Sequence, residues 1–333
     1  MSILGYGRGA NYRGFYEKLK VIGREEGRPV ISLLGAFVLS FFECSCGLSD
    51  FINYRLWEKT ARERREYVTI GRCDKLYEAV SPSAYKTFFT VKPNFLRNFA
   101  PWIHRDFFDP EQEDAARLKV FLEQNPVFME KPIDGLAGRD VSKRSASEIS
   151  SPEDYYNQLK TGRMFIEGYL TQHPDMAALA PASVNTLRIM TVCYDNQPEI
   201  LYACARIGSG TASVDNFHAG GMGVAIDEKT GRLRGQAVNK DEAYFDCHPV
   251  TGIRFDGYQI PFWKEAREAC LKGACVNQKI HCVGWDVAIT PDGPAFIEGN
   301  RRPGYDLVQM IEKRGCMDLV RRVYARRDAA KDR

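Results

Sequence analysis

The stretch GWDVAITPDGPAFIEGNRRPG, residues 284–304, decides how this sequence is interpreted. Two apolar segments flank the turn-forming residues Thr-Pro-Asp-Gly-Pro at 290–294, and this pattern predicts two strands joined as a hairpin. Asp286 lies in the first strand, while Glu298 and Asn300 lie two residues apart in the second and therefore share a face. A hairpin can bring these three oxygen-bearing side chains to one point.

Two carboxylates and an amide are hard oxygen ligands of the kind that Mg²⁺ prefers, and Mg²⁺ also keeps positions for water and substrate phosphates. The sequence therefore predicts a magnesium site on Asp286, Glu298 and Asn300. A structural alternative stays open, in which Asp286 caps its strand and the other two side chains satisfy a turn. The neighbours Trp285 and Val287 favour the metal, because an acid in an apolar strand is costly to bury without a cation or a hydrogen-bonded partner.

A second segment, FMEKPIDGLAGRDV at residues 128–141, is typical of a strand, a glycine-bearing loop and another strand. Lys131 ends the apolar strand, where a cation could meet a phosphate, and Gly135 and Gly138 allow the loop's backbone N–H groups to fold over a nucleotide. The segment has neither the GK[ST] of a Walker loop nor GxGxxG. An ordinary hairpin therefore stays open as the alternative.

Two arginines lie in apolar segments that predict strands, Arg188 in TLRIM and Arg206 in CARIG. A guanidinium in such a segment needs an anionic partner. The sequence leaves open whether that partner is a substrate group or a structural carboxylate.

The chain of 333 residues has room for two domains, and 44% apolar and 27% charged residues are typical of a soluble globular protein. Its first hundred residues predict helices at 13–24, 30–42 and 50–65, and short β-rich segments follow Pro126. The fold class is therefore α+β, with antiparallel sheets. A net charge of only +3 gives no reason to expect a nucleic-acid partner.

The ten cysteines include no CxxC pair, and several lie in apolar runs, which favours free thiols and a cytoplasmic location. The first 28 residues are polar and of mixed charge, so they predict no signal peptide. The apolar run at 30–42 has 13 residues, against about 20 for a spanning helix. A buried or interfacial helix is the better interpretation, and membrane association is open but not favoured.

Taken in order, these segments resemble the ATP-grasp superfamily, and most closely its sugar-transfer associated branch, which is related to α-L-glutamate ligases. The resemblance covers residues 47–309 and rests on SVNTLRIMT, RIGSGTASVDNFHAGGMGVAID, CHPVTG, IPFW, GWDVAITPDGPAFIEGN and RPG. It implies two α+β subdomains gripping ATP, after a helical region that replaces the usual α/β domain. The implied division is a helical region at 1–90, and a catalytic domain at 91–325 with a glycine-loop subdomain at about 126–166 and a metal subdomain at about 167–325.

The resemblance also implies roles for residues of the nucleotide site. Lys131 matches the second phosphate lysine, and Lys92 is preferred to Lys75 as the first. The backbone that holds adenine matches Phe165, Ile166 and Glu167, with the ribose contact just beyond, at Gln172, His173 or Asp175. The metal residues match Asp286, Glu298 and Asn300, which implies two Mg²⁺ ions, with Mn²⁺ as a possible substitute.

At the reacting centre, the resemblance matches Arg188 and Arg206 to arginines that face the transferred phosphate and an acyl phosphate. The residues matching a loop over that centre are Asn216, His218, Gly220 and Gly221.

The activity implied is that of an ATP- and magnesium-dependent carboxylate–amine ligase that forms an acyl phosphate. Its substrates would be small molecules, namely a carboxylate and an amine, and the branch suggests a sugar acid in polysaccharide biosynthesis. Two alternatives stay open: a phosphotransferase acting on a hydroxyl, and a non-catalytic nucleotide-binding component of a glycan assembly complex. Neither the acceptor nor the oligomeric state follows from the sequence.

Overall fold

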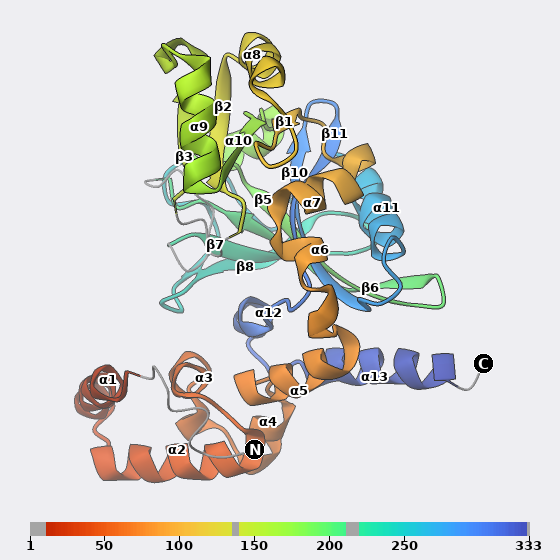
Figure 1. The fold of residues 1–333 in the computed structure, drawn as a ribbon. Coiled ribbons are helices and arrows are strands. Elements are labelled where there is room, and N and C mark those ends of the chain that lie inside the picture. The colour runs from red at the N-terminus through yellow and green to blue at the C-terminus, as the bar shows by residue number, and fades with distance from the viewer. Residues whose placement is uncertain (1–10, 135–139, 211–219, 332–333) are drawn as a thin grey trace.

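The larger of two antiparallel sheets carries the hairpin that decides the fold (Figure 1). The computed structural model describes residues 11–134, 140–210 and 220–331. The larger sheet has the order β11-β10-β5-β6-β7-β8-β9, and all its pairs are antiparallel, as predicted. Its strands are β5 (Thr186–Tyr194), β6 (Gln197–Ile207), β7 (Met222–Ile226), β8 (Leu233–Asn239), β9 (Tyr244–Phe245), β10 (Cys282–Thr290) and β11 (Gly293–Asn300).

The smaller sheet has the order β1-β4-β2-β3 and lies beside the larger one in Figure 1. Its strands are β1 (Phe107–Phe108), β2 (Val127–Pro132), β3 (Ser142–Ser145) and β4 (Met164–Gly168). Two helices, α8 (Ala115–Gln124) and α9 (Pro152–Gly162), pack on it through a core that includes Phe121, Phe128 and Tyr155. Strand β2, which carries Lys131, therefore belongs to a sheet with its own small core.

The two faces of the larger sheet are covered by different helices. On one face, Leu187, Trp285 and Val287 pack against α11 (Trp263–Ala274), together with residues of α6 (Thr87–Thr90) and α7 (Lys92–Asn98). On the other face, Met190 and Val192 pack against α5 (Ile70–Val80) and α13 (Met317–Lys331). Helix α12 (Asp306–Glu312) contacts β7 and β8, and α10 (Pro174–Leu179) follows β4.

The N-terminal region is helical, as predicted, with α1 (Tyr12–Glu25) and α2 (Val30–Cys44) close to their predicted bounds. A single helix over 50–65 is wrong: the segment forms α3 (Leu48–Asn53), a 3-10 turn η2 (Leu56–Glu58) and α4 (Ala61–Glu66). Arg55 adopts a left-handed backbone with φ 46°, and Thr60 caps α4, so the helix ends and restarts. Further 3-10 turns are η3 (Ser83–Tyr85), η4 (Ala100–Trp102) and η5 (Ala146–Glu148).

The predicted domain boundary at 90–91 falls between α6 and α7, which both pack on the larger sheet, and it stays a prediction.

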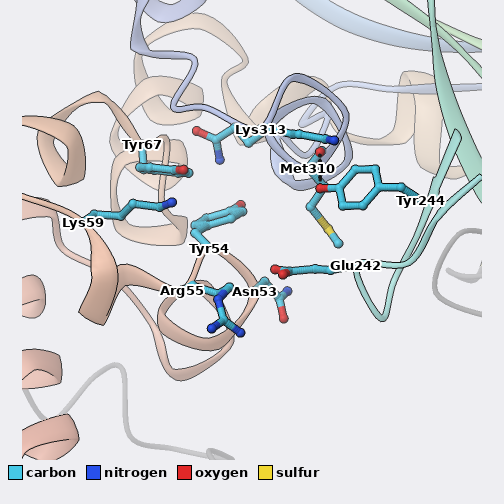
Figure 2. Close-up of a pocket in the computed structure, with 10 residues that line it drawn as sticks. Asn53, Tyr54, Arg55, Lys59, Tyr67, Glu242, Tyr244, Met310 and Lys313 are labelled. Carbon is cyan, nitrogen blue, oxygen red and sulfur yellow. Dashed lines mark hydrogen bonds between the residues drawn. The ribbon is translucent and has the colours of Figure 1, made fainter. Parts of the chain in front are cut away.

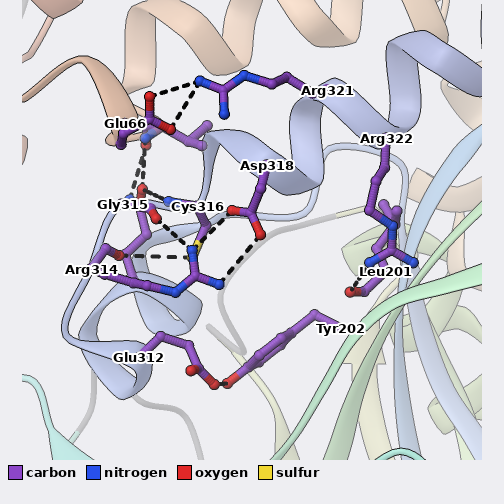
Figure 3. Close-up of polar contacts among 12 residues, drawn as sticks. Glu66, Leu201, Tyr202, Glu312, Arg314, Gly315, Cys316, Asp318, Arg321 and Arg322 are labelled. Carbon is purple, nitrogen blue, oxygen red and sulfur yellow. Dashed lines mark hydrogen bonds and ion pairs between the residues drawn. The ribbon is translucent and has the colours of Figure 1, made fainter. Parts of the chain in front are cut away.

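Polar contacts attach the N-terminal helical region to the C-terminal helices α12 and α13 (Figure 3). Arg321 of α13 donates two hydrogen bonds, of 2.8 and 2.9 Å, to Glu66 of α4. Nearby, the buried Gln309 accepts a hydrogen bond from the Val68 backbone N–H at 2.6 Å and donates to its carbonyl at 3.2 Å. These contacts hold α4, α12 and α13 together.

A cavity of about 120 Å³ lies at the same junction (Figure 2). The N-terminal region contributes the stacked rings of Tyr54 and Tyr67, and the β8–β9 turn contributes Glu242. The cavity is lined by Asn53, Tyr54, Arg55, Lys59, Tyr67, Glu242, Tyr244, Gln309, Met310 and Lys313. It contains none of the residues predicted to bind nucleotide or metal.

Candidate active site

A row of charged side chains crosses three strands of the larger sheet. Glu298 on β11 is the direct partner of Asp286 on β10, which is the direct partner of Arg188 on β5. Directly opposite residues of antiparallel strands point to the same face of a sheet. The predicted metal residues and a predicted catalytic arginine are therefore neighbours on one face.

Asp286 is fully buried and is the centre of this row. Arg188 binds it with Nε–Oδ1 and Nη2–Oδ2 distances of 2.5 and 3.0 Å, and Arg206 adds an Nη2–Oδ2 contact of 3.1 Å. Burial opposes ionisation, but the two guanidinium groups lower the pKa of Asp286 to about 2. The anionic partner of both arginines, left open by the sequence, is in this structure the carboxylate of Asp286.

Glu298 and Asn300 complete the site. The Asn300 Nδ2 donates to Glu298 Oε1 at 3.1 Å, and Glu298 shares a hydrogen bond with Asp286. Partial desolvation and the adjacent Asp286 raise the pKa of Glu298 above its usual value. Two adjacent carboxylates beside an amide oxygen suit a divalent cation, whose charge offsets their mutual repulsion.

The residues present thus fit a magnesium ion held by Glu298 and Asn300, with Asp286 adjacent. Within the described ranges, no group of three or more His, Cys, Asp or Glu side chains could hold a metal ion by itself. The amide and the nucleotide phosphates would therefore have to supply the other ligands. The assignment of the three residues as metal ligands stays a prediction.

Two lysines form the opposite side of the candidate site. Lys131, at the end of β2, contacts Glu167 of β4 with an Nζ–Oε1 distance of 2.5 Å. Lys92, at the start of α7, donates from Nζ to the Pro132 carbonyl at 2.9 Å. Burial and then the charge of Lys131 lower the pKa of Lys92, while the charges of Glu298 and Glu167 oppose that change. Lys92 is therefore electrostatically coupled both to Lys131 of β2 and to Glu298 of the β10–β11 hairpin.

Local sequence explains how Lys92 reaches this position. Gly299 lies between the two predicted metal ligands of β11, and a Cβ atom there would stand 2.5 Å from the Phe89 ring and 2.9 Å from the Phe95 ring. The glycine thus lets α6 and α7 pack closely on the hairpin. The backbone N–H of Lys92 also donates to the Ile133 carbonyl at 2.9 Å. The rival Lys75 is exposed on α5, next to Asp74, which pairs with Arg302.

Glu167 has a role that the sequence did not predict. Its buried carboxylate contacts Lys131 and also accepts from Arg105 Nη2 at 3.0 Å, and these two cations lower its pKa to about 2 against the effect of burial. Arg105 also donates to the Phe296 carbonyl of β11 at 2.8 Å. Arg105 therefore links the smaller sheet to the β10–β11 hairpin.

The residues predicted to contact adenine and ribose lie in and just after β4. Phe165 and Ile166 are buried in β4, which pairs with β2 on one side and, at Ile166 and Glu167, with β1 on the other. His173 caps α10, accepting from the Asp175 N–H at 3.2 Å, and its own backbone N–H donates to the Ile289 carbonyl. The structure gives these residues packing and capping roles, and their nucleotide contacts stay predictions.

Several predicted residues cannot be placed. Gly135, Gly138, Asn216 and His218 lie outside the described residues. Gly220 is described, has φ 102°, and directly precedes the segment that enters β7.

A hydrogen-bond network that the sequence did not predict holds the start of the segment after β6. Asn185 accepts through Oδ1 from the Gly208 N–H at 3.1 Å, and His248 bonds through Nε2 to the Gly208 carbonyl at 2.9 Å. The other ring nitrogen of His248 accepts from the backbone N–H groups of Val250 and Thr251. Asn185 lies in the family motif SVNTLRIMT and His248 in CHPVTG. The motifs therefore marked these two residues, although the sequence did not predict their contacts.

A small sheet with lysines, facing a larger antiparallel sheet that presents a carboxylate–amide hairpin, is the architecture of the ATP-grasp fold. The chain belongs to the sugar-transfer associated ATP-grasp family, whose profile matches residues 107–325, more than half of its length. The predicted fold is thereby confirmed, and the described residues that precede the matched range are mainly helical.

Solved structures of ATP-grasp proteins are similar to the chain at low sequence identity. The ligase PsnB with its minimal precursor matches with a TM-score of 0.45 and 16% identity, over 80% of this chain and 71% of that one. D-cycloserine synthetase DcsG gives 0.41 and 14%, over 76% and 77%. The D-alanine–D-alanine ligase from Coxiella burnetii gives 0.43 and 10%, over 78% and 67%. No curated protein matches the sequence.

Proposed function

We propose that this protein is an ATP- and magnesium-dependent ligase that joins a carboxylate to an amine through an acyl phosphate. The proposal rests on one observation: a pair of lysines lies close to a row of charged side chains on the larger sheet. Lys92 and Lys131 lie on the side of the smaller sheet, and the row of Glu298, Asp286 and Arg188 lies on the larger one. Such an arrangement suits a triphosphate, whose charge must be neutralised along its length during transfer.

In the proposed reaction, an oxygen of the acceptor carboxylate attacks the γ-phosphorus, and the bond to the β-phosphate oxygen breaks to release ADP. The amine nitrogen then attacks the acyl carbon, phosphate leaves and the nitrogen loses a proton. Lys92 and Lys131 bind the phosphates. Arg188 and Arg206, held in place by Asp286, stabilise charge on the acyl phosphate. Glu298 and Asn300, with Asp286 adjacent, would hold magnesium, which would supply Lewis-acid neutralisation of phosphate charge.

We further propose that the acceptor is a sugar acid and that the reaction serves polysaccharide biosynthesis. The support is the family to which the chain belongs, which is defined by its association with sugar transfer. A reducing compartment such as the cytoplasm suits the chain, because all ten of its cysteines are free.

The test is an ATP-dependent phosphate-release screen in which sugar acids and amino acids are supplied in pairs. The active acceptor is then prepared with ¹⁸O in its carboxylate, and the products are analysed by mass spectrometry. The proposal predicts an amide product and one ¹⁸O atom in the released phosphate, because an acyl phosphate transfers a carboxylate oxygen to phosphorus. A phosphorylated product without release of phosphate would indicate a phosphotransferase instead. If no pair supports turnover and Mg–ATP does not bind, the protein is a non-catalytic component.

Two variants provide the matched control. Glu298→Gln should lower turnover at least about a hundredfold, since it removes a charged group that faces the phosphates. Asp292→Asn removes a carboxylate that is exposed in the turn of the same hairpin, and it should leave turnover unchanged. Equal activity of the two variants would refute the role of Glu298.

A further inference from the structure

Helix α2 exposes a stripe of large apolar side chains. Ile31, Val38, Leu39 and Phe42 are 76%, 51%, 58% and 73% exposed. Their spacing of seven, eight and eleven residues from Ile31 places them on one face of the helix. The opposite face buries Leu33 and Cys44 in a core with residues of α1, α3 and η2. The helix is thus apolar on both sides, and only one of them has a protein partner within the described ranges.

The stripe lies far from the candidate active site. Figure 1 shows α2 at the end of the molecule opposite the two sheets, with α5, α12 and α13 between them. The outer face of α2 is therefore available to a large partner without obstruction of the nucleotide site. A contiguous exposed apolar surface of this kind marks an interaction site in a folded protein.

The charges of the helices that contact α2 indicate the kind of partner. The neighbouring helices α1 and α4 contact α2 and carry five exposed cations that have no ion-pair partner in the described part of the chain. These are Arg13, Lys18, Arg24, Arg62 and Arg65. The only acid of α2 is Glu43, which is neutralised by Arg64 at 2.5 Å.

Acidic groups of these two helices are fewer, and most of them are engaged in ion pairs or hydrogen bonds. On α1, Glu17 pairs with Lys20 at 2.9 Å, which leaves Glu25 exposed. On α4, Glu63 accepts from the Thr60 N–H and hydroxyl as a helix cap. The balance of charges without a partner is therefore positive, which complements an anionic surface.

We propose that α2 docks in the plane of an anionic lipid membrane. In this arrangement the stripe enters the boundary between headgroups and acyl chains, while the cations of α1 and α4 contact lipid phosphates. The helix has 15 residues, about 22 Å in length. None of the described helices is both long and apolar enough to cross a bilayer, so contact would be with one surface only.

A second copy of the chain fits the stripe less well. A twofold contact through α2 would bring the same patches of the two copies together. The unpaired positive charges of the two copies would then be brought close together and repel, whereas a membrane supplies the opposite charge. The inference goes beyond the proposed ligase activity and does not rest on it.

The test is cosedimentation of the full chain with vesicles of phosphatidylcholine, with and without phosphatidylglycerol. The wild type should bind the anionic vesicles, and added salt should weaken that binding. The double variant Ile31→Ser with Phe42→Ser should lower the partition coefficient at least about tenfold, since it removes two apolar side chains from the bilayer. The double variant Val120→Ser with Val276→Ser removes exposed apolar residues elsewhere and should bind as the wild type does.

The cation contribution is tested separately with Arg24→Glu and Arg62→Glu combined, which should weaken binding to anionic vesicles but not to neutral ones. Circular dichroism and ATP affinity should be unchanged in every variant, because each altered side chain is exposed and outside the candidate site. The proposal is overturned if the wild type does not bind vesicles, or if the Ile31 and Phe42 variant binds equally well. It is also overturned if sedimentation velocity shows a dimer that this variant dissociates while vesicle binding is absent.

Discussion

Asp286 and Glu298 are adjacent carboxylates with opposite expected effects on the stability of the metal-free protein. Asp286 is buried between two guanidinium groups, and its pKa falls from 3.8 to about 2. Because the folded-state pKa is lowered, this interaction stabilises the fold fully above pH 3.8 and is lost as the pH falls toward 2. At neutral pH the change corresponds to about 2.5 kcal/mol, and removal of one partner of a buried ion pair costs a similar amount, roughly 3 to 5 kcal/mol.

The variant Asp286→Asn keeps the shape of the side chain but leaves Arg188 and Arg206 facing a neutral amide. We expect the free energy of unfolding at neutral pH to fall by about 3 kcal/mol. Glu298 differs, since its pKa is raised and its ionised form is disfavoured in the folded protein. Glu298→Gln should therefore change the unfolding free energy by less than about 0.5 kcal/mol, or stabilise the protein slightly.

Urea unfolding followed by circular dichroism, without nucleotide or magnesium, measures both variants under the same conditions. Turnover with Mg–ATP should be lost in both variants. Only Glu298→Gln should therefore lose activity without a loss of stability. Equal destabilisation by the two variants, or a neutral Asp286→Asn, would refute the assignment of Asp286 as the anchor of the arginines.

Three further predictions concern the surroundings of the row. Lys92→Ala should weaken ATP binding, measured by calorimetry, about ten- to hundredfold, whereas Lys75→Ala should leave it unchanged. The reverse result would assign Lys75 as the first phosphate lysine instead. In the presence of an ATP analogue, the affinity for Mg²⁺ should fall as the pH is lowered through the raised pKa of Glu298, because the proton competes with the metal. An affinity that does not change with pH in this range would contradict metal binding at Glu298. Gly299→Ala should lower the unfolding free energy by about 1 to 3 kcal/mol through a clash with aromatic rings, while Gly35→Ala, with no neighbouring atom within 4 Å, should not destabilise.

The hairpin could be predicted from sequence because its signals are local. Two apolar segments on either side of a turn of Pro, Asp and Gly define both strands, and the two-residue spacing places Glu298 and Asn300 on one face. The position of Lys131 near the end of a strand could be predicted in the same way. Each of these inferences needed only residues within one segment.

The partners of the arginines could not be predicted, because they depend on register between strands that are far apart in sequence. Arg188 and Asp286 are 98 residues apart, and a shift of one residue would turn either side chain to the opposite face. Likewise, Lys92 reaches the site only through the packing of Phe89 and Phe95 against Gly299. Helical spacing over 50–65 failed for a related reason, since a left-handed residue ends the helix without changing the apolar pattern.

The central claim is that the β10–β11 hairpin holds the divalent cation. The most direct measurement is a crystal structure with Mn²⁺ and a non-hydrolysable ATP analogue, in which the anomalous signal locates the metal. The account predicts a peak within about 2.2 Å of a Glu298 carboxylate oxygen and of the Asn300 amide oxygen, with further ligands from the phosphates. A metal coordinated by the phosphates and other residues, with neither Glu298 nor Asn300 among its ligands, would contradict it.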